Sequence, residues 1–147
     1  MLTSVRDLLE AKGDEVWSVS PKTTIIDAMK IMSEKRIGNL LVLENDQIAG
    51  IVSERDFVRM IAEEGTCKLD EPVSAVMTRV VFTVDPSQSI EDCMIMMTEK
   101  RIRHLPVVEN NQIVGMISIG DVIKGIISSQ KFTIDQLTKY IGGGYNQ

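Results

Sequence analysis

Two segments of this chain repeat each other without a gap, and this repeat constrains the fold more than any other feature. Residues 19–61 read VSPKTTIIDAMKIMSEKRIGNLLVLENDQIAGIVSERDFVRMI, and residues 84–126 read VDPSQSIEDCMIMMTEKRIRHLPVVENNQIVGMISIGDVIKGI. The copies align at a constant offset of 65 residues, with about 20 of roughly 43 positions identical. Two copies are too few for a solenoid, which needs at least about three. We therefore expect a pseudo-symmetric pair of units that shares one core.

Each copy predicts a strand followed by an amphipathic helix. The extended segments EVWSV and RVVFTV end at Pro21 and Pro86, because proline cannot donate to a central ladder. Thr24 and Ser89 are candidate helix caps, each with an aspartate three residues on. The apolar residues that follow have helical spacing, and a Met-rich stripe of this kind favours core packing over a cofactor site. They are Ile25, Ala28, Met29 and Met32 in the first copy, and Ile90, Cys93, Met94 and Met97 in the second.

The rest of each copy predicts a hairpin and a second helix. LLVLENDQIAGIV and LPVVENNQIVGMI are apolar runs joined by Asn-Asp or Asn-Asn, which tolerate the positive φ values of tight turns. Helices are expected over 53–64 and 118–129, with separate short helices at SVRDLLEA and at FTIDQLTKYI, the latter ended by GGG. The fold class is therefore α+β, with each unit strand–helix–strand–strand–helix. We expect boundaries at residues 1–68, 69–130 and 131–147.

Composition excludes several function classes. The formal net charge is −5, which disfavours nucleic-acid binding. No apolar run approaches the roughly 18 residues of a membrane span, and the N-terminus does not have the pattern of a signal peptide. We expect a soluble, cytoplasmic protein. Two cysteines without a CxxC pair and a single histidine do not support a metal site or a catalytic centre.

Each copy resembles a cystathionine β-synthase (CBS) domain, and the pair resembles a Bateman module. The segments that carry the resemblance are VSP and VDP, EKRIGNLLV and EKRIRHLPV, and GIVSERD and GMISIGD, in the same order and spacing in both copies. The resemblance covers nearly the whole chain. It implies a clefted pseudo-twofold pair that binds adenine nucleotides and forms a homodimer.

Ser53 to Asp56 and Ser118 to Asp121 both have the pattern S-x-x-D after a strand. One interpretation is a helix capping box. The other uses the same geometry for a ligand, since a helix N-terminus suits a phosphate and the aspartate can accept from ribose hydroxyls. Arg55 favours a bound anion in the first copy, because a cation is unfavourable in the first turn of a helix, although an exposed salt bridge would also explain it.

Arg103 and His104 are a basic pair in an acidic chain. The resemblance implies that these positions contact phosphate, and arginine can do so with two parallel bonds. The alternative is a solvated arginine beside a structural histidine. The first copy has Gly38 and Asn39 at the same positions, so the two sites should differ in size and charge.

The resemblance also implies that each site is completed by the other copy. Under this prediction the site containing Ser53, Arg55 and Asp56 prefers the more anionic ligand. The first site contains Ser53, Arg55, Asp56, Val84, Ile102 and Arg103, and the second contains Ser118, Asp121, Val19, Ile37 and Gly38, with His104 in the cleft.

Three functions compete at this point. The leading hypothesis is a regulatory sensor that binds AMP, with ADP, ATP or NAD as close alternatives, and signals to an unidentified protein partner through a change in cleft or dimer geometry. The second is a structural dimerisation or interaction module with no nucleotide. The third, a nucleotide hydrolase, lacks a nucleophile–base pair or a metal cluster, so we expect no enzyme activity.

Overall fold

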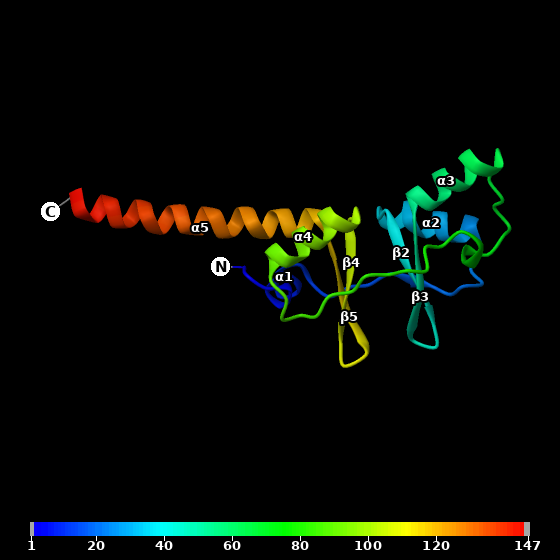
Figure 1. Ribbon diagram of the computed structural model, residues 1–147, viewed down its shortest axis with the longest axis horizontal. Coiled ribbons are helices and arrows are strands. Elements are labelled where there is room, and N and C mark those ends of the chain that lie inside the picture. Colours follow the sequence, from blue (N-terminus) through cyan, green and yellow to red (C-terminus); the bar gives the residue numbers. More distant parts are fainter. Residues whose placement is uncertain (1, 146–147) are drawn as a thin grey trace. The chain divides into compact units, whose positions relative to one another are not determined.

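The computed structural model describes residues 2–145 and confirms an α+β fold (Figure 1). The chain forms two compact units. One spans Val16–Val81, and the other joins the N-terminal segment, through Glu15, to the chain from Phe82 onward. The elements in chain order are α1 (Val5–Lys12), β1 (Ser18–Val19), α2 (Ile25–Lys35), β2 (Asn39–Glu44), β3 (Gln47–Ser53), α3 (Glu54–Glu64), a 3-10 turn η1 (Val73–Ala75), α4 (Ile90–Lys100), β4 (His104–Glu109), β5 (Gln112–Ser118) and α5 (Ile119–Tyr145).

The predicted hairpins are present in both copies. Strand β2 pairs antiparallel with β3, and β4 pairs antiparallel with β5. The turns have positive φ at Asn45 (52°) and Asp46 (61°), and at Asn110 (53°) and Asn111 (60°). These values are those of the tight turns whose twist matches a hairpin, so the polar pairs in the sequence do fix the turns.

The first strand of each copy is shorter than predicted. In the first copy only Ser18–Val19 pairs with β2, in parallel, and in the second copy a single parallel bridge joins Val84 to Val107. The difference between copies has a local cause. Leu41 donates its backbone N–H to Trp17 O at 3.3 Å, whereas the equivalent residue in the second copy is Pro106, which has no N–H to donate.

Helices α2 and α4 form as the sequence predicts. Thr24 Oγ1 accepts from Asp27 N at 3.3 Å, and Ser89 Oγ accepts from Asp92 N at 3.0 Å. The stripes predicted from helical spacing face the two cores. Ile25, Ala28 and Met32 are buried in the Val16–Val81 unit, and Ile90, Cys93 and Met97 are buried in the other.

Two expectations about the ends of the chain were wrong. The helices predicted over 118–129 and at FTIDQLTKYI are one continuous helix, α5, and the GGG segment lies inside it (Figure 1). No proline separates the two predicted helices, and glycine in a helix costs only about 1 kcal/mol per residue, which weakens a helix without forbidding it.

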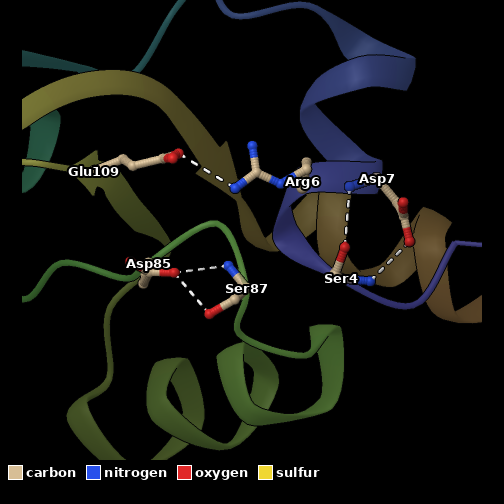
Figure 2. Close-up of polar contacts among 6 residues, drawn as sticks. All are labelled: Ser4, Arg6, Asp7, Asp85, Ser87 and Glu109. Carbon is tan, nitrogen blue, oxygen red and sulfur yellow. Dashed lines mark hydrogen bonds and ion pairs between the residues drawn. The ribbon is translucent and has the colours of Figure 1, made fainter.

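Helix α1 packs on the second copy, which differs from the expected division at residue 68. Val5 N donates to Gln88 O at 2.9 Å, and Arg6 N donates to Pro86 O at 2.9 Å. An ion pair between Arg6 and Glu109, at 3.3 Å, supports the same docking, and Asp7 caps the helix start by accepting from Ser4 N (Figure 2). The N-terminal segment therefore belongs to the unit that contains the second copy.

The link after the first copy docks on that copy in the same way. Val73 N donates to Thr23 O at 2.8 Å, and Ser74 N donates to Pro21 O at 3.2 Å. Thr23 and Pro21 are the repeat equivalents of Gln88 and Pro86. The two units therefore share one plan, in which a flanking segment completes each repeat.

Two equivalent glycines let the flanking segments approach the hairpins closely. A Cβ at Gly50 would lie 2.8 Å from Thr78 O and 2.8 Å from Met77 Sδ. A Cβ at Gly115 would lie 2.6 Å from Leu9 Cδ2. Real Cβ atoms do not approach this closely, so a side chain at either position would push the flanking segment away.

We expect Gly50→Ala to lower the free energy of unfolding by about 1–3 kcal/mol, because the obstructing carbonyl of Thr78 is held in the backbone. Gly115→Ala should cost less, since the side chain of Leu9 can change rotamer. Gly120→Ala is the control, because its Cβ would meet only Ser118 Oγ at 3.6 Å. Urea unfolding of the three variants checks the order, and an equal loss for Gly50 and Gly120 would contradict it.

Candidate ligand-binding site

The candidate site is built at the junctions where β3 runs into α3 and β5 runs into α5. At each junction the aspartate of the S-x-x-D pattern caps the helix. Ser53 N donates to Asp56 Oδ2 at 2.7 Å, and Ser118 N donates to Asp121 Oδ2 at 2.8 Å. The capping interpretation is therefore confirmed at both positions. A ligand could bond these carboxylates only where the capping bonds leave an oxygen able to accept another hydrogen bond.

Asp56 is buried inside its unit. Its side chain is 3% exposed. Thr78 Oγ1 donates to Oδ1 at 2.9 Å, and the guanidinium of Arg59 pairs with the same oxygen. Ser53 supplies two donors to Oδ2, its backbone N–H and its hydroxyl. A ligand could reach this carboxylate only by displacing donors that the protein already supplies, which would be costly for a buried charge.

Asp121 is more open and has a cationic partner that the sequence did not predict. Its side chain is 20% exposed, and Lys12 Nζ donates to Oδ2 at 2.7 Å. The same ammonium donates to Met116 O at 2.7 Å. Burial raises the pKa of the Asp121 carboxyl, but the bonds from Lys12 and Ser118 outweigh it and hold that pKa below its usual value. Asp121 is therefore ionised at neutral pH.

Lys12 and Thr78 have corresponding roles in the two units. Each comes from the flanking segment that completes its repeat, and each bonds the aspartate at the start of the second helix. A neutral hydroxyl performs this role in the first copy and a charged ammonium performs it in the second. Each aspartate nevertheless pairs with a cation, Arg59 in the first copy and Lys12 in the second, so the copies differ in which element supplies it.

The basic pair lies beside Asp121. Arg103 is exposed, and its carbonyl accepts from Ile119 N at 2.8 Å, which holds the strand against the start of α5. His104 begins β4 and pairs with Ser118 on β5. Burial lowers the pKa of His104, and the positive charges of Lys12 and Arg103 lower it further, while Asp121 partly offsets them. His104 is therefore neutral at pH 7.

The structure thus groups five polar residues at one end of the second copy, and we call them the Asp121 cluster: Lys12, Arg103, His104, Ser118 and Asp121. Four of them are predicted site residues. Lys12 lies 91 residues or more from the others in the chain, so only the docking of α1 could have revealed it. A helix N-terminus, the bonded ammonium of Lys12, the exposed arginine Arg103 and one carboxylate make this cluster suited to a ligand with both hydroxyl and anionic groups.

The first copy has no comparable basic group at the position of Arg103. Gly38 accepts from Glu54 N at 3.1 Å, and a Cβ there would face the carboxylate of Glu54 at 3.7 Å. Arg55 is exposed in the first turn of α3. Val19 is buried and Ile37 packs on the core of the same unit, while Val84 and Ile102 do so in the other. The completion of each site by the other copy stays a prediction.

Among the residues that the structure describes, no group of three or more His, Cys, Asp or Glu side chains is arranged to hold a metal ion. Over the same part of the chain, no helix is both long and apolar enough to cross a membrane.

The repeated fold and the two capped strand–helix junctions define a tandem pair of small α+β modules. The family model for the CBS domain matches the chain twice, over residues 5–63 and 73–128. The chain therefore belongs to the CBS domain family.

Curated relatives include two CBS domain-containing proteins. The chain is 34% identical over 97% of its length to the mitochondrial protein CBSX3 of Arabidopsis thaliana, of which it covers 74%. It is 30% identical over 88% of its length to YhcV of Bacillus subtilis, of which it covers 89%.

Solved structures agree. A CBS-domain containing protein from Agrobacterium tumefaciens matches with a TM-score of 0.82 and 39% identity, over 85% of this chain and 94% of that one. The CBS domain pair of protein MJ0100, in complex with 5'-methylthioadenosine and S-adenosyl-L-methionine, matches in fold with a TM-score of 0.76 and 21% identity, over 88% of this chain and 99% of that one.

The single histidine makes the Asp121 cluster measurable by NMR. We expect the pKa of His104 to lie below that of the same residue in the urea-unfolded chain, because burial and two cations disfavour imidazolium. Lys12→Met should raise this pKa by removing one cation, and Asp121→Asn should lower it by removing the offsetting charge. Imidazole ¹³C shifts followed against pH give all three values, and an unchanged pKa in both variants would remove His104 from the cluster.

Proposed function

We propose that this protein is a regulatory module that binds an adenine nucleotide, with AMP as the first choice and ADP, ATP or NAD as alternatives, at the Asp121 cluster. One observation carries the proposal: an ionised, partly open carboxylate lies at a helix N-terminus, is bonded to Lys12, and shares a cluster with His104 and Arg103. The adenosine-containing ligands of the MJ0100 pair support the ligand class.

In this proposal Asp121 accepts from the ribose hydroxyls, and Ser118 contributes a hydroxyl of its own. Arg103 and the positive end of the α5 helix dipole bind phosphate. His104 is neutral before binding, and a phosphate beside it would favour the charged form. Small and apolar residues of the first copy, Val19, Ile37 and Gly38, would complete the adenine end.

The corresponding site at Asp56 is the weaker candidate. The residues proposed for it are Ser53, Arg55 and Asp56, with Val84 and Ile102. Binding there would have to compete with Thr78 and Arg59 for the carboxylate. We therefore propose that the Asp121 cluster is occupied first and that Asp56 has mainly a structural role.

The output of binding completes the proposal. We infer that the protein acts as a cytoplasmic homodimer without catalytic activity of its own. Occupancy of the site shifts its conformation, and an unidentified protein partner responds to the shift. A ligand can shift such an equilibrium only by its differential affinity for the two states.

Calorimetric titration with AMP, ADP, ATP and NAD tests the binding site. We expect Asp121→Ala to weaken the tightest ligand by roughly ten- to hundredfold, since charge-assisted bonds contribute about 1.5–3 kcal/mol. Asp56→Ala should instead lower the free energy of unfolding while one binding event remains. Equal affinity in wild type and both variants would contradict the site, and no binding by wild type at millimolar ligand would contradict the function.

A second titration separates phosphate binding from shape. Arg103→Ala should weaken AMP roughly tenfold or more and leave adenosine nearly unchanged, because only AMP carries the phosphate. Lys139→Ala is the matched control, since it removes one exposed cation from α5 outside the cluster. An equal loss for AMP and adenosine would mean that Arg103 shapes the fold and does not bind phosphate.

A further inference from the structure

The C-terminal part of α5 carries an apolar stripe that nothing in its own unit covers. We call Ile123, Ile127, Ile134, Leu137 and Ile141 the α5 stripe. Their exposed fractions are 43%, 57%, 61%, 57% and 56%. Successive members are separated by four, seven, three and four residues. At 3.6 residues per turn this spacing places all five on one side of the helix.

The stripe differs from the face that α5 uses in its own core. Val122 and Gly125 are buried, and a Cβ at Gly125 would meet Leu8 and Ile90, so this face packs on α1 and α4. From Gln130 to Ile141 every side chain is exposed. Figure 1 shows this part of α5 running clear of α1, α4 and the β4–β5 hairpin.

An unsupported helix of this kind is poorly stable in water. The segment from Gln130 onward includes Thr133, Thr138 and three glycines, which are poor helix formers. A helix in proteins gains most of its stability from packing its apolar face. The α5 stripe supplies such a face, and a partner is needed to cover it.

We propose that the partner is a second copy of this chain, joined through a parallel two-stranded coiled coil of α5 helices. With Ile127, Ile134 and Ile141 at the a positions of a heptad repeat, Ile123, Gln130 and Leu137 fall at the d positions. In parallel coiled coils, isoleucine at a with leucine at d, as at Ile134 and Leu137, favours two strands, and a single polar residue in the seam specifies the register at a cost in stability. Gln130 is that residue, and the seam is about 27 Å long.

Charge favours parallel over antiparallel pairing. Lys124 and Lys131 are at e positions, whereas the g positions are Ile126, Thr133 and Tyr140. Parallel helices bring e residues against g residues of the partner, so no two like charges face each other. Antiparallel helices would bring e against e and set the two Lys131 side chains on the same edge of the seam, where they repel.

This proposal names the surface of the proposed homodimer and does not depend on nucleotide binding. A parallel pair also has the two-fold symmetry that most soluble dimers show. The Asp121 cluster and the stripe share no residue, so each can be tested without the other.

Sedimentation equilibrium of the full chain tests the stripe. We expect wild type to be a dimer and Ile134→Asp to raise the dissociation constant by at least about tenfold, because a carboxylate would be buried in the seam. Gln136→Asp is the matched control, since it adds the same charge on the same helix away from the stripe and should leave the dimer intact. Circular dichroism and AMP titration of both variants check that the fold and the ligand site are unchanged.

Disulfide trapping in a Cys67→Ser background tests the direction. Ile127→Cys and Ile141→Cys should each form a covalent dimer of identical chains, whereas Asp135→Cys, on the polar side, should not. An antiparallel pair can bring only one of the two positions against itself, so formation at one position alone would overturn the parallel arrangement. A monomeric wild type, or a dimer that Ile134→Asp leaves unchanged, would overturn the proposal as a whole.

Discussion

The docking of helix α1 on the second copy is the interaction on which the chemistry of that copy depends. Main-chain bonds from Val5 and Arg6 hold the start of the helix, and its far end carries Lys12 to Asp121. The backbone bonds set where the helix lies, and the length of the helix sets which side chain arrives at the carboxylate. Gly115 permits the close approach. A lysine far from the repeat in the sequence thereby becomes part of its most polar cluster.

The same construction gives a different result in the first copy. There the flanking segment carries Thr78 to Asp56, and Arg59 adds a second donor from within the helix. The positive charge of Arg59 balances the negative charge of this carboxylate, which is buried. In the second copy the single ammonium of Lys12 leaves Asp121 partly open. The two copies therefore share one fold and differ in how far the equivalent carboxylate is exposed.

The sequence predicted the parts of this structure that local patterns control. The buried helix stripes follow from the helical spacing of the apolar residues, and the turns at Asn45 and Asn110 follow from residue types that accept positive φ. The weak first strand of the second copy could also have been predicted, since Pro106 stands where the first copy has a donor. The docking of α1 could not be predicted, because it rests on backbone hydrogen bonds, which do not depend on residue type. The sequence does not predict the role of Lys12 for that reason, and GGG does not end α5 because glycine weakens a helix without forbidding it.

The proposed ligand site and the proposed dimer surface both include part of α5. Its first turn contains Asp121 and the positive helix end proposed for phosphate, and the α5 stripe occupies the same helix from its second turn to Ile141. An α-helix of this length spans about 40 Å and bends little, so a small rotation at its first turn displaces its far end. A nucleotide that changes the angle between β5 and α5 would therefore change how the α5 stripes of two chains pack against each other. Because such coupling is reciprocal, a dimer that favours one orientation of α5 must favour the ligand state that shares it by the same free energy.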